Sequence, residues 1–320
     1  MKRMKRTAFA LLIALSATLV RAQESQEVYS FLRLPVSAHV AALGGDNISI
    51  TDDDPTMIFH NPALIVMADS VSDKSLNLNY MTYMEGAKTA SASFVKGVGE
   101  KAAWGVSAQY MDYGSMKETT MENIELGEFS AKDIALAATF AYQLGKEIHG
   151  GITARYISST IGGYSSAAVG IDLGLNYYNE EKGLSLSAVA KNLGGQIKAY
   201  EDEFERIPFD LQVGVTKRLI GSPLRLSATL SRLNNWEQGF IKHLAVGADL
   251  FLAHNIYVAA GYNFRRSSEM KIEDDEGTSN HGAGFSLGAG LQLQRFKLQV
   301  GYAKYHISAS SLLVNATFCL

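Results

Sequence analysis

Cysteine is nearly absent from this 320-residue sequence, because its only cysteine, Cys319, is the penultimate residue. A single cysteine excludes an intrachain disulfide framework and a thiolate metal cluster. Neither sign of charge dominates, since the formal net charge is −3. A chain so close to neutral lacks the strong positive field that favours nucleic acid. We therefore expect no nucleic-acid partner.

Long hydrophobic runs are missing after the amino terminus, so no later helix is expected to cross a membrane. At the amino terminus, a basic stretch that includes Lys2 and Arg6 precedes an apolar region over residues 7–20. Val20 and Ala22 then place small residues at the −3 and −1 positions of a cleavage site. We therefore expect residues 1–22 to be a signal peptide that is removed on export.

Apolar residues alternate with small polar ones through most of the sequence after residue 74, a period of two that is typical of strands. Near the end, Leu312 and Val314 share one face of the expected strand, while Asn315 and Thr317 share the other. Many runs reach the about 9–11 residues that a tilted strand needs to cross a bilayer. The pattern predicts fourteen strands, at 75–84, 88–97, 101–113, 132–143, 147–160, 165–178, 183–192, 209–219, 223–234, 241–252, 255–266, 283–294, 296–307 and 310–320.

The connections between these strands alternate in length. Those after even-numbered strands are short, whereas three of the others are long, at 114–131, 195–208 and 267–282. Outer-membrane barrels have this asymmetry, with short periplasmic turns and longer outer loops. Residues 75–320 are therefore predicted to form an all-β, 14-stranded antiparallel barrel integral to the outer membrane, in contact with its lipid. Seven tyrosines near strand ends are expected to form its aromatic girdles: Tyr80, Tyr110, Tyr113, Tyr142, Tyr177, Tyr302 and Tyr305.

Residues 23–74, between the signal peptide and the first strand, form an N-terminal hatch segment in this prediction. Asp54-Pro55 and Asn61-Pro62 each place a capping side chain before a proline, which suits the start of a short helix. The inward positions of the barrel are mainly small residues, and a fourteen-stranded barrel is too wide for them to fill. We therefore expect this segment to fold inside the lumen as a plug.

Three motifs with catalytic or ligand-binding precedents have simpler explanations here. Ser93 and Lys96 match a serine–x–x–lysine motif, but they lie in an expected strand and its companion motifs are missing. The run Asp52-Asp53-Asp54 lacks the spacing of a calcium loop and is interpreted as capping and solvated turn charge. Gly44 and Gly45 are not followed by a phosphate-loop lysine and are expected to provide backbone freedom. No enzymatic activity, cofactor or metal site is predicted.

The stretch FLRLPVSAHVAALGGDNISITDDDPTMIFHNPAL, residues 31–64, closely resembles the N-terminal signature of the PorQ family, outer-membrane components of the type IX secretion system. Its NPAL element is similar to the hatch motif of the wider FadL-like superfamily of fourteen-stranded, plugged barrels. The resemblance marks these positions as hatch residues: Gly44, Gly45, Asp54, Pro55, His60, Asn61, Pro62, Ala63 and Leu64.

The resemblance to this family implies a non-enzymatic role in protein secretion. In that role the barrel anchors the surface protein PorZ, beside PorU and PorV, in the complex that attaches secreted cargo to the cell surface. The long outer loops would then hold the partner through acidic and aromatic residues: Glu122, Glu125, Phe129, Tyr200, Glu203, Phe204, Glu273, Asp274 and Asp275.

A different function class also fits this fold, namely a FadL-like transporter of hydrophobic small molecules. Fold alone does not decide between the two classes. A transporter should show an apolar pocket, and the small polar inward positions of this sequence show no cluster of large apolar residues. The sequence therefore favours the anchoring role.

We predict that the exported chain begins near Gln23, because cleavage after Ala22 satisfies the small-residue rule at both positions. Intact mass spectrometry of protein purified from outer membranes measures this directly. A mass that includes Met1 to Ala22 would contradict the prediction.

Overall fold

The structure is a computed structural model that describes residues 27–67, 74–84, 86–236, 239–270, 272–274, 277–279, 282–306 and 309–320. The predicted signal peptide lies outside these residues. No helix in the described part of the chain is long and apolar enough to cross a membrane.

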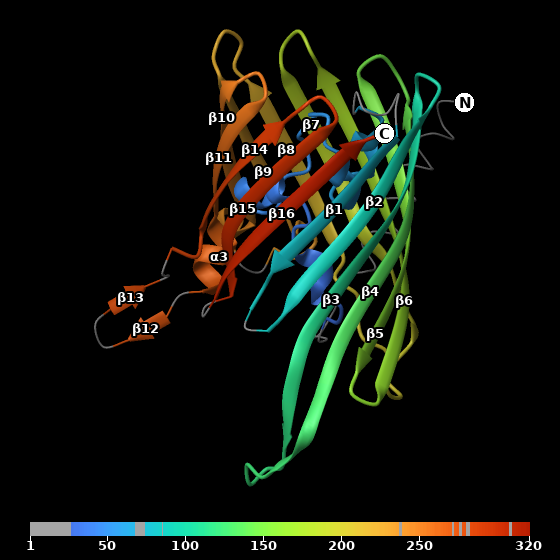
Figure 1. The fold of residues 1–320 in the computed structure, drawn as a ribbon, viewed down its shortest axis with the longest axis vertical. Helices are drawn as coiled ribbons and strands as arrows, with labels where there is room; N and C mark the ends of the chain where they lie inside the picture. Colours follow the sequence, from blue (N-terminus) through green and yellow to red (C-terminus); the bar gives the residue numbers. More distant parts are fainter. Residues whose placement is uncertain are drawn as a thin grey trace, which may run out of the picture.

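Fourteen antiparallel strands close into one barrel, which confirms the predicted fold class and strand number. Each strand pairs with its neighbours along the chain, and the first strand pairs with the last (Figure 1). The strands are β1 (Lys74–Thr82), β2 (Lys88–Val98), β3 (Ala102–Thr119), β4 (Glu125–Gln143), β5 (Ile148–Ile161), β6 (Tyr164–Asn179), β7 (Leu184–Lys198), β8 (Asp210–Arg218), β9 (Leu224–Leu230), β10 (Leu244–Ala253), β11 (Ile256–Asn263), β14 (Phe285–Gln292), β15 (Phe296–His306) and β16 (Ala309–Cys319).

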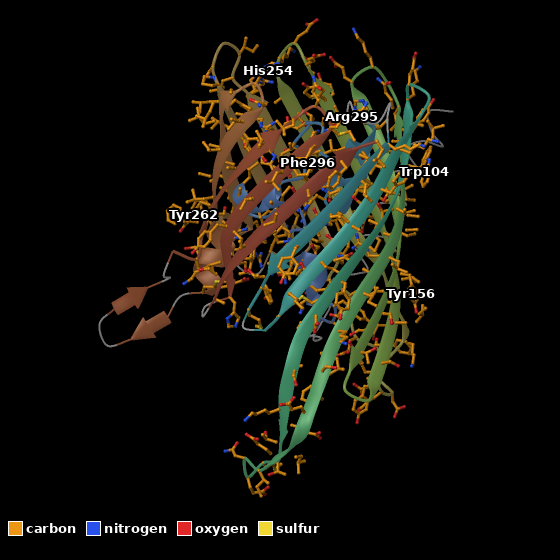
Figure 2. The ribbon with its side chains drawn as sticks, viewed as in Figure 1. Trp104, Tyr156, His254, Tyr262, Arg295 and Phe296 are labelled. Carbon is orange, nitrogen blue, oxygen red and sulfur yellow. The ribbon has the colours of Figure 1, made fainter. Side chains whose placement is uncertain are left out.

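The outer surface of the barrel is apolar. In β4, Ile134 and Leu136 are exposed, while the alternating Asp133 and Ala135 are buried inside. Trp104 and Tyr156 likewise project outward from the wall (Figure 2). A slip of one residue in strand register would turn every apolar side chain inward, so the pattern defines the register. An apolar exterior on a closed barrel is the arrangement of an outer-membrane barrel.

The two ends of the barrel differ, as the connection lengths predict. The short-turn end carries six brief connections: 99–101, 144–147, 180–183, 219–223, 254–255 and 293–295. The opposite end, called here the long-loop end, carries the extended connections (Figure 1).

The prediction that residues 114–131 form a loop is wrong, because β3 and β4 continue beyond the barrel as a two-stranded ribbon. Only residues 120–124 connect the two strands. Lys117 faces Glu128 across the ribbon and forms an ion pair with Glu125. Opposite charges on facing strands stabilise such a pair. The charges that suggested a solvated loop therefore belong to paired strands.

The other long connections also differ from the prediction. β7 extends through Lys198, into the predicted loop 195–208. The predicted loop 267–282 begins within α3 (Phe264–Glu269) and holds the small hairpin of β12 (Ile272–Asp274) and β13 (Gly277–Ser279). β9 ends at Leu230, so residues 231–243 form a further long connection that includes η5 (Phe240–His243).

Residues 27–67, called here the lumenal segment, lie inside the barrel (Figure 1). They form η1 (Ser30–Arg33), α2 (Ala38–Ala42), η2 (Pro55–Phe59) and η3 (Pro62–Val66). Both predicted caps are confirmed, since the side chain of Asp54 accepts from Thr56 N and that of Asn61 accepts from Ala63 N. The helices they start are single turns of 3₁₀ type.

The core of the protein lies between the lumenal segment and the barrel wall. At the long-loop end, Phe31 and Leu32 pack against Met111 and Ile157 of the wall. Further inside, Leu43, Ile50 and Met57 form a second buried cluster with other residues of the segment. The segment therefore buries some apolar residues against the wall and others mainly against one another, with Ala259 of β11 completing the second cluster.

Paired inward-facing glycines allow the lumenal segment to approach the wall closely. Gly151 and Gly174 are register partners on β5 and β6 and lie beneath Asn61 and Pro62. A Cβ atom on Gly174 would lie 2.2 Å from Asn61 Oδ1. Around α2, a second set of inward glycines serves the same purpose: Gly247, Gly261, Gly288 and Gly301. The glycines of these strands are thus contact sites for the segment.

Gly174→Val is predicted to displace η3 and to destabilise the folded protein by about 1–3 kcal/mol, because overpacking forces the neighbouring backbone to shift. Urea unfolding in detergent micelles measures the loss. Gly195→Val is the matched control, since nothing lies within 4 Å of a Cβ atom there. Equal effects of the two substitutions would contradict the proposed contact.

Candidate functional site

The acidic triplet, Asp52 to Asp54, attaches the lumenal segment to the wall near the short-turn end. Asp52 Oδ1 lies 2.5 Å from Arg225 Nη1. Asp53 forms an ion pair with Lys297, and Asp54 Oδ2 accepts from Gln299 Nε2 at 3.1 Å. The expected capping role holds for Asp54, but the other two charges are not simply solvated. They pair with basic residues of two different strands, β9 and β15.

A buried histidine extends this network. His39 Nε2 lies 2.7 Å from Asp249 Oδ1, and Arg225 Nε donates to Asp249 Oδ2, also at 2.7 Å. The side chains of all three residues are 5% exposed or less. Burial alone would raise the pKa of Asp52, but the adjacent charge of Arg225 outweighs it and lowers that pKa below its ordinary value. Removing one partner from a buried ion pair is strongly destabilising, so this network holds the segment in place.

The predicted hatch residues are brought together in the lumen. Asn61 Nδ2 donates to Ile48 O at 2.9 Å, which joins η3 to the preceding chain. His60 Nε2 accepts from Ser37 N at 3.2 Å, and Lys191 Nζ donates to Phe59 O at 3.1 Å. Pro55, Pro62, Ala63 and Leu64 are buried in the two turns.

Gly44 and Gly45 form the bend after α2. Their φ angles are +101° and +96°, a backbone conformation that favours glycine. Gly44 O accepts from Asn263 Nδ2 at 2.9 Å, so the bend is also attached to β11. The expected role in backbone freedom is confirmed by these angles.

Two polar cavities flank the lumenal segment. One, of about 540 Å³, is near the short-turn end and is lined by the acidic triplet, Arg225 and Lys297. The other, of about 380 Å³, is near the long-loop end and is lined by Arg33, His60 and several further charged residues. Within the described part of the chain, no group of three or more His, Cys, Asp or Glu residues is placed to hold a metal ion.

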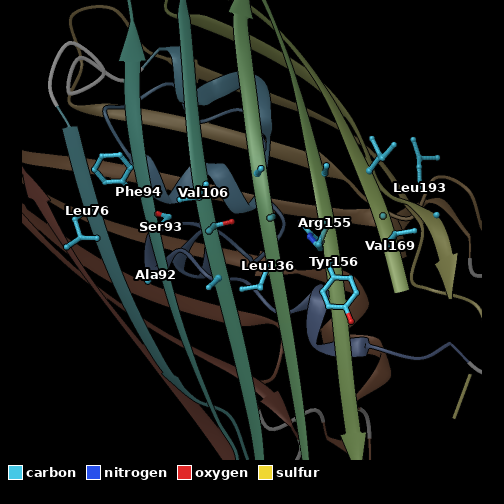
Figure 3. A pocket seen from close by; sticks show the side chains of 18 residues that line it. Leu76, Ala92, Ser93, Phe94, Val106, Leu136, Arg155, Tyr156, Val169 and Leu193 are labelled. Atoms are coloured by element: carbon cyan, nitrogen blue, oxygen red, sulfur yellow. The ribbon is translucent and has the colours of Figure 1, made fainter. Parts of the chain in front are cut away.

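A third hollow, of about 970 Å³, lies on the outer face of the wall over β1 to β7 (Figure 3). Its lining is apolar and combines small residues such as Ala92 with larger ones such as Phe94, Leu136 and Tyr156. These side chains face outward, toward the surrounding membrane. The sequence showed no cluster of large apolar residues at the inward positions, and this apolar hollow lies on the exterior.

The described partner-binding residues of the prediction are spread over β4, its ribbon tip, the 199–209 connection and β12. Glu125 and Phe129 are in strand β4, and Tyr200 donates a hydrogen bond to Ser159 of β5, whose side chain is buried on the inner face. Glu122 at the ribbon tip and Phe204 in the 199–209 connection are exposed. Glu203 is exposed beside Phe204. Glu273 and Asp274 belong to β12, and Asp275 lies outside the described residues.

Two further expectations are settled by the direction of side chains. Ser93 is buried on the inner face, whereas Lys96, three residues later in the same strand, is exposed on the other. They are therefore not placed to act together.

Three of the girdle tyrosines, Tyr80, Tyr142 and Tyr302, are exposed on the exterior. In contrast, the Tyr113 hydroxyl donates to Asp133 Oδ2 at 2.7 Å, and the ring of Tyr305 packs under the guanidinium of Arg266. Tyr113 and Tyr305 face the lumen, so their assignment to the girdle is wrong.

Sequence reasoning missed the charges of the inner wall. The inward positions include ionic pairs such as Arg155 with Asp172, whose Nη2 and Oδ2 atoms are 2.6 Å apart. These charges could have been found in the sequence, because each is a charged residue on the inward face of a strand whose other inward residues are mainly small. Their pairing was not visible, because it joins different strands and the lumenal segment.

No protein-family model and no curated protein sequence matches this chain. The crystal structure of the Pseudomonas putida toluene transporter TodX is similar in fold, with 15% identity and a TM-score of 0.58 over 89% of this chain and 97% of that chain. The monoaromatic hydrocarbon channel CymD is 14% identical, with a TM-score of 0.56 over 89% and 96%. A Pseudomonas aeruginosa FadL homologue is 12% identical, with a TM-score of 0.53 over 89% and 98%. The fold is therefore similar to that of these solved barrels.

His60 is predicted to make folding stability sensitive to mild acid. Burial, and then the charge of Lys191, lower its pKa well below the ordinary value of 6.5. The stability from neutral His60 is therefore present above pH 6.5 and is lost as pH falls below it, since only the unfolded chain then binds the proton. In urea unfolding from pH 7.5 to pH 5, His60→Gln should lose less stability than the native chain. His254→Gln, at an exposed turn, is the control; identical pH profiles for all three proteins would contradict the prediction.

Proposed function

We propose that this chain is an outer-membrane channel for small hydrophobic molecules. The observation that carries the proposal is the likeness in fold to TodX, CymD and a FadL homologue over about nine-tenths of the chain. TodX is a toluene transporter and CymD is a monoaromatic hydrocarbon channel. This chain has the same barrel and an N-terminal segment inside it. The proposal ranks above the anchoring role, for which the sequence resemblance is the main support.

In this proposal the lumenal segment is a plug that must shift for a solute to pass. The segment approaches the wall closely at inward glycines around α2 and η3. Ion pairs of Asp52 and Asp53 with the wall hold it near the short-turn end. Movement would therefore require breaking these polar contacts and also separating packed side chains, such as Phe31 and Leu32 from Met111 and Ile157.

The lining of the lumen limits which solutes are suited to it. Both lumenal cavities carry paired charges, and neither is lined mainly by large apolar side chains. A solute with an apolar body and one polar group is better matched to these walls than a bare hydrocarbon, because polar wall groups must keep hydrogen-bond partners. We infer that such solutes are the preferred ones.

The second candidate function is the anchoring of a surface protein, by resemblance PorZ with PorU and PorV, in a type IX secretion system. The specific observation in its favour is the ribbon of β3 and β4 beyond the barrel. Its tip exposes apolar residues beside acidic ones, and Met121 is 97% exposed. Exposed apolar residues with a charged rim are a common form of protein-binding surface.

One set of variants separates the two functions. Uptake of radiolabelled toluene and of benzyl alcohol is measured in outer-membrane vesicles that carry one of three proteins. These are the native chain, a chain without residues 27–67, and a ribbon-shortened chain in which a short Gly-Ser turn replaces residues 115–129. The proposed channel predicts uptake above that of empty vesicles by the native and the ribbon-shortened chains, with faster uptake of benzyl alcohol. Removal of residues 27–67 should raise the passage of both probes and open a conductance in planar bilayers.

Absence of uptake by the native chain would contradict the channel proposal. Copurification of a surface protein with the native chain, and its loss from the ribbon-shortened chain, would then place anchoring first. Heat-modifiable mobility on gels verifies that each variant has formed its barrel.

A further inference from the structure

The cavity at the long-loop end of the lumen carries more basic than acidic side chains. Its volume is about 380 Å³. Its basic residues are Arg33, Lys191, Arg232, Arg265 and Arg266, and its acidic residues are Glu27, Asp46, Asp210 and Glu269. The pairing of these charges decides what the cavity can bind.

Two of the acidic side chains accept hydrogen bonds mainly from neutral donors. Asp46 Oδ2 accepts from Asn263 Nδ2 at 2.9 Å. The carboxylate of Asp210 accepts from the backbone N of Arg232 at 2.6 Å and from Gln212 Nε2 at 2.8 Å. These acids therefore do not form close ion pairs with the arginines of the cavity.

The guanidinium groups of Arg33, Arg232 and Arg265 are only partly neutralised. Arg232 Nη1 and Arg265 Nη1 lie 3.7 and 3.6 Å from the same atom, Glu269 Oε1. Both distances exceed that of a hydrogen bond. Arg33 pairs with Glu27 through Nη2, but its Nη1 is buried and has no hydrogen-bond partner among the described residues. Donors are thus left over within a confined space.

Arg33 and Arg265 each lie close enough to Arg232 to repel its charge. Burial lowers the pKa of Arg232, and the nearby charges of Arg33 and Arg265 lower it further. Lys191 and Arg266 add positive charge to the cavity. Lys191 Nζ donates to Phe59 O, and Arg266 Nε donates to Ala283 O at 2.7 Å. Backbone carbonyls satisfy these donors without neutralising their charge.

We propose that this cavity binds a water-soluble solute that carries a phosphate group, held by Arg33, Arg232 and Arg265. A phosphate offers three terminal oxygens and about 1.5–2 negative charges at pH 7. It can therefore accept from several guanidinium groups at once, whereas a carboxylate offers two oxygens and one charge. The Tyr305 hydroxyl lines the same cavity.

The position of the cavity favours a free solute over a lipid headgroup. Its lining comes from the lumenal segment, the inner face of the wall and the connections at the long-loop end. The membrane contacts the other face of the wall. The test of this site does not depend on the proposed passage of hydrophobic molecules, because binding is measured without transport.

The test is calorimetric titration of the mature chain, in a neutral detergent free of phosphate groups, with inorganic phosphate and with glycerol phosphate. Saturable binding is expected for both probes. The double substitution Arg33→Gln with Arg232→Gln should weaken it at least about tenfold, the effect of losing one charge-assisted hydrogen bond. Arg218→Gln is the matched control, because Arg218 lines the other cavity, beside Phe251, and its loss should leave binding unchanged.

Absence of saturable binding, or equal weakening by Arg218→Gln, would overturn the proposal. If the double variant does not form a heat-modifiable barrel, Arg265→Gln alone is used, with the same expected direction and Arg265→Lys retaining part of the affinity. A third arm adds nanodiscs with or without phosphatidic acid. Competition by phosphatidic acid against inorganic phosphate would refute the assignment to a free solute and identify a lipid headgroup instead.

Discussion

The lumen of a fourteen-stranded barrel is wider than small inward side chains can fill, and most of this structure follows from that constraint. The inner wall is built mainly of glycine, alanine and short polar residues, so it leaves space rather than a packed core. Residues 27–67 occupy that space and bury Phe31, Leu43 and Met57 there. Without the wall the segment has only single helical turns, which are not stable alone. Segment and wall therefore depend on each other for a core.

Electrostatics inside the barrel follows from the same arrangement. Charges in an enclosed lumen are costly unless they are paired and hydrogen-bonded. Asp52 and Asp249 meet this requirement through one residue, Arg225, which contacts both carboxylates. The basic residues at the long-loop end meet it incompletely, since Glu269 is shared between Arg232 and Arg265 at long distance. The two ends of the lumen thus differ in charge balance, although both are polar.

The distribution of apolar surface bears on function. The exterior carries an apolar hollow over β1 to β7, whereas the lumenal cavities are polar. The fold places the chain beside hydrocarbon channels, but its lumen is not an apolar conduit in the described state. The ribbon of β3 and β4 is a further distinct surface, because its strands pair with each other beyond the last residues of β5. The two proposed functions therefore involve separate parts of the molecule, the lumen and the ribbon.

Local pattern determined the strand number, the outward faces and the short turns, because alternation of period two decides which face of each strand is buried. Local chemistry likewise determined the caps at Asp54 and Asn61, since each requires only the next two residues. The two caps were therefore predictable from sequence, but the contacts of Asn61 and Pro62 with Gly151 and Gly174 were not. Those contacts, the pairing of Asp52 with Arg225, and the inward direction of Tyr113 and Tyr305 depend on residues distant in the chain. The ends of β3 and β4 were also missed, because cross-strand pairing, not hydropathy, extends them past the barrel. Only closure of the barrel brings these groups together, so tertiary structure alone decided them.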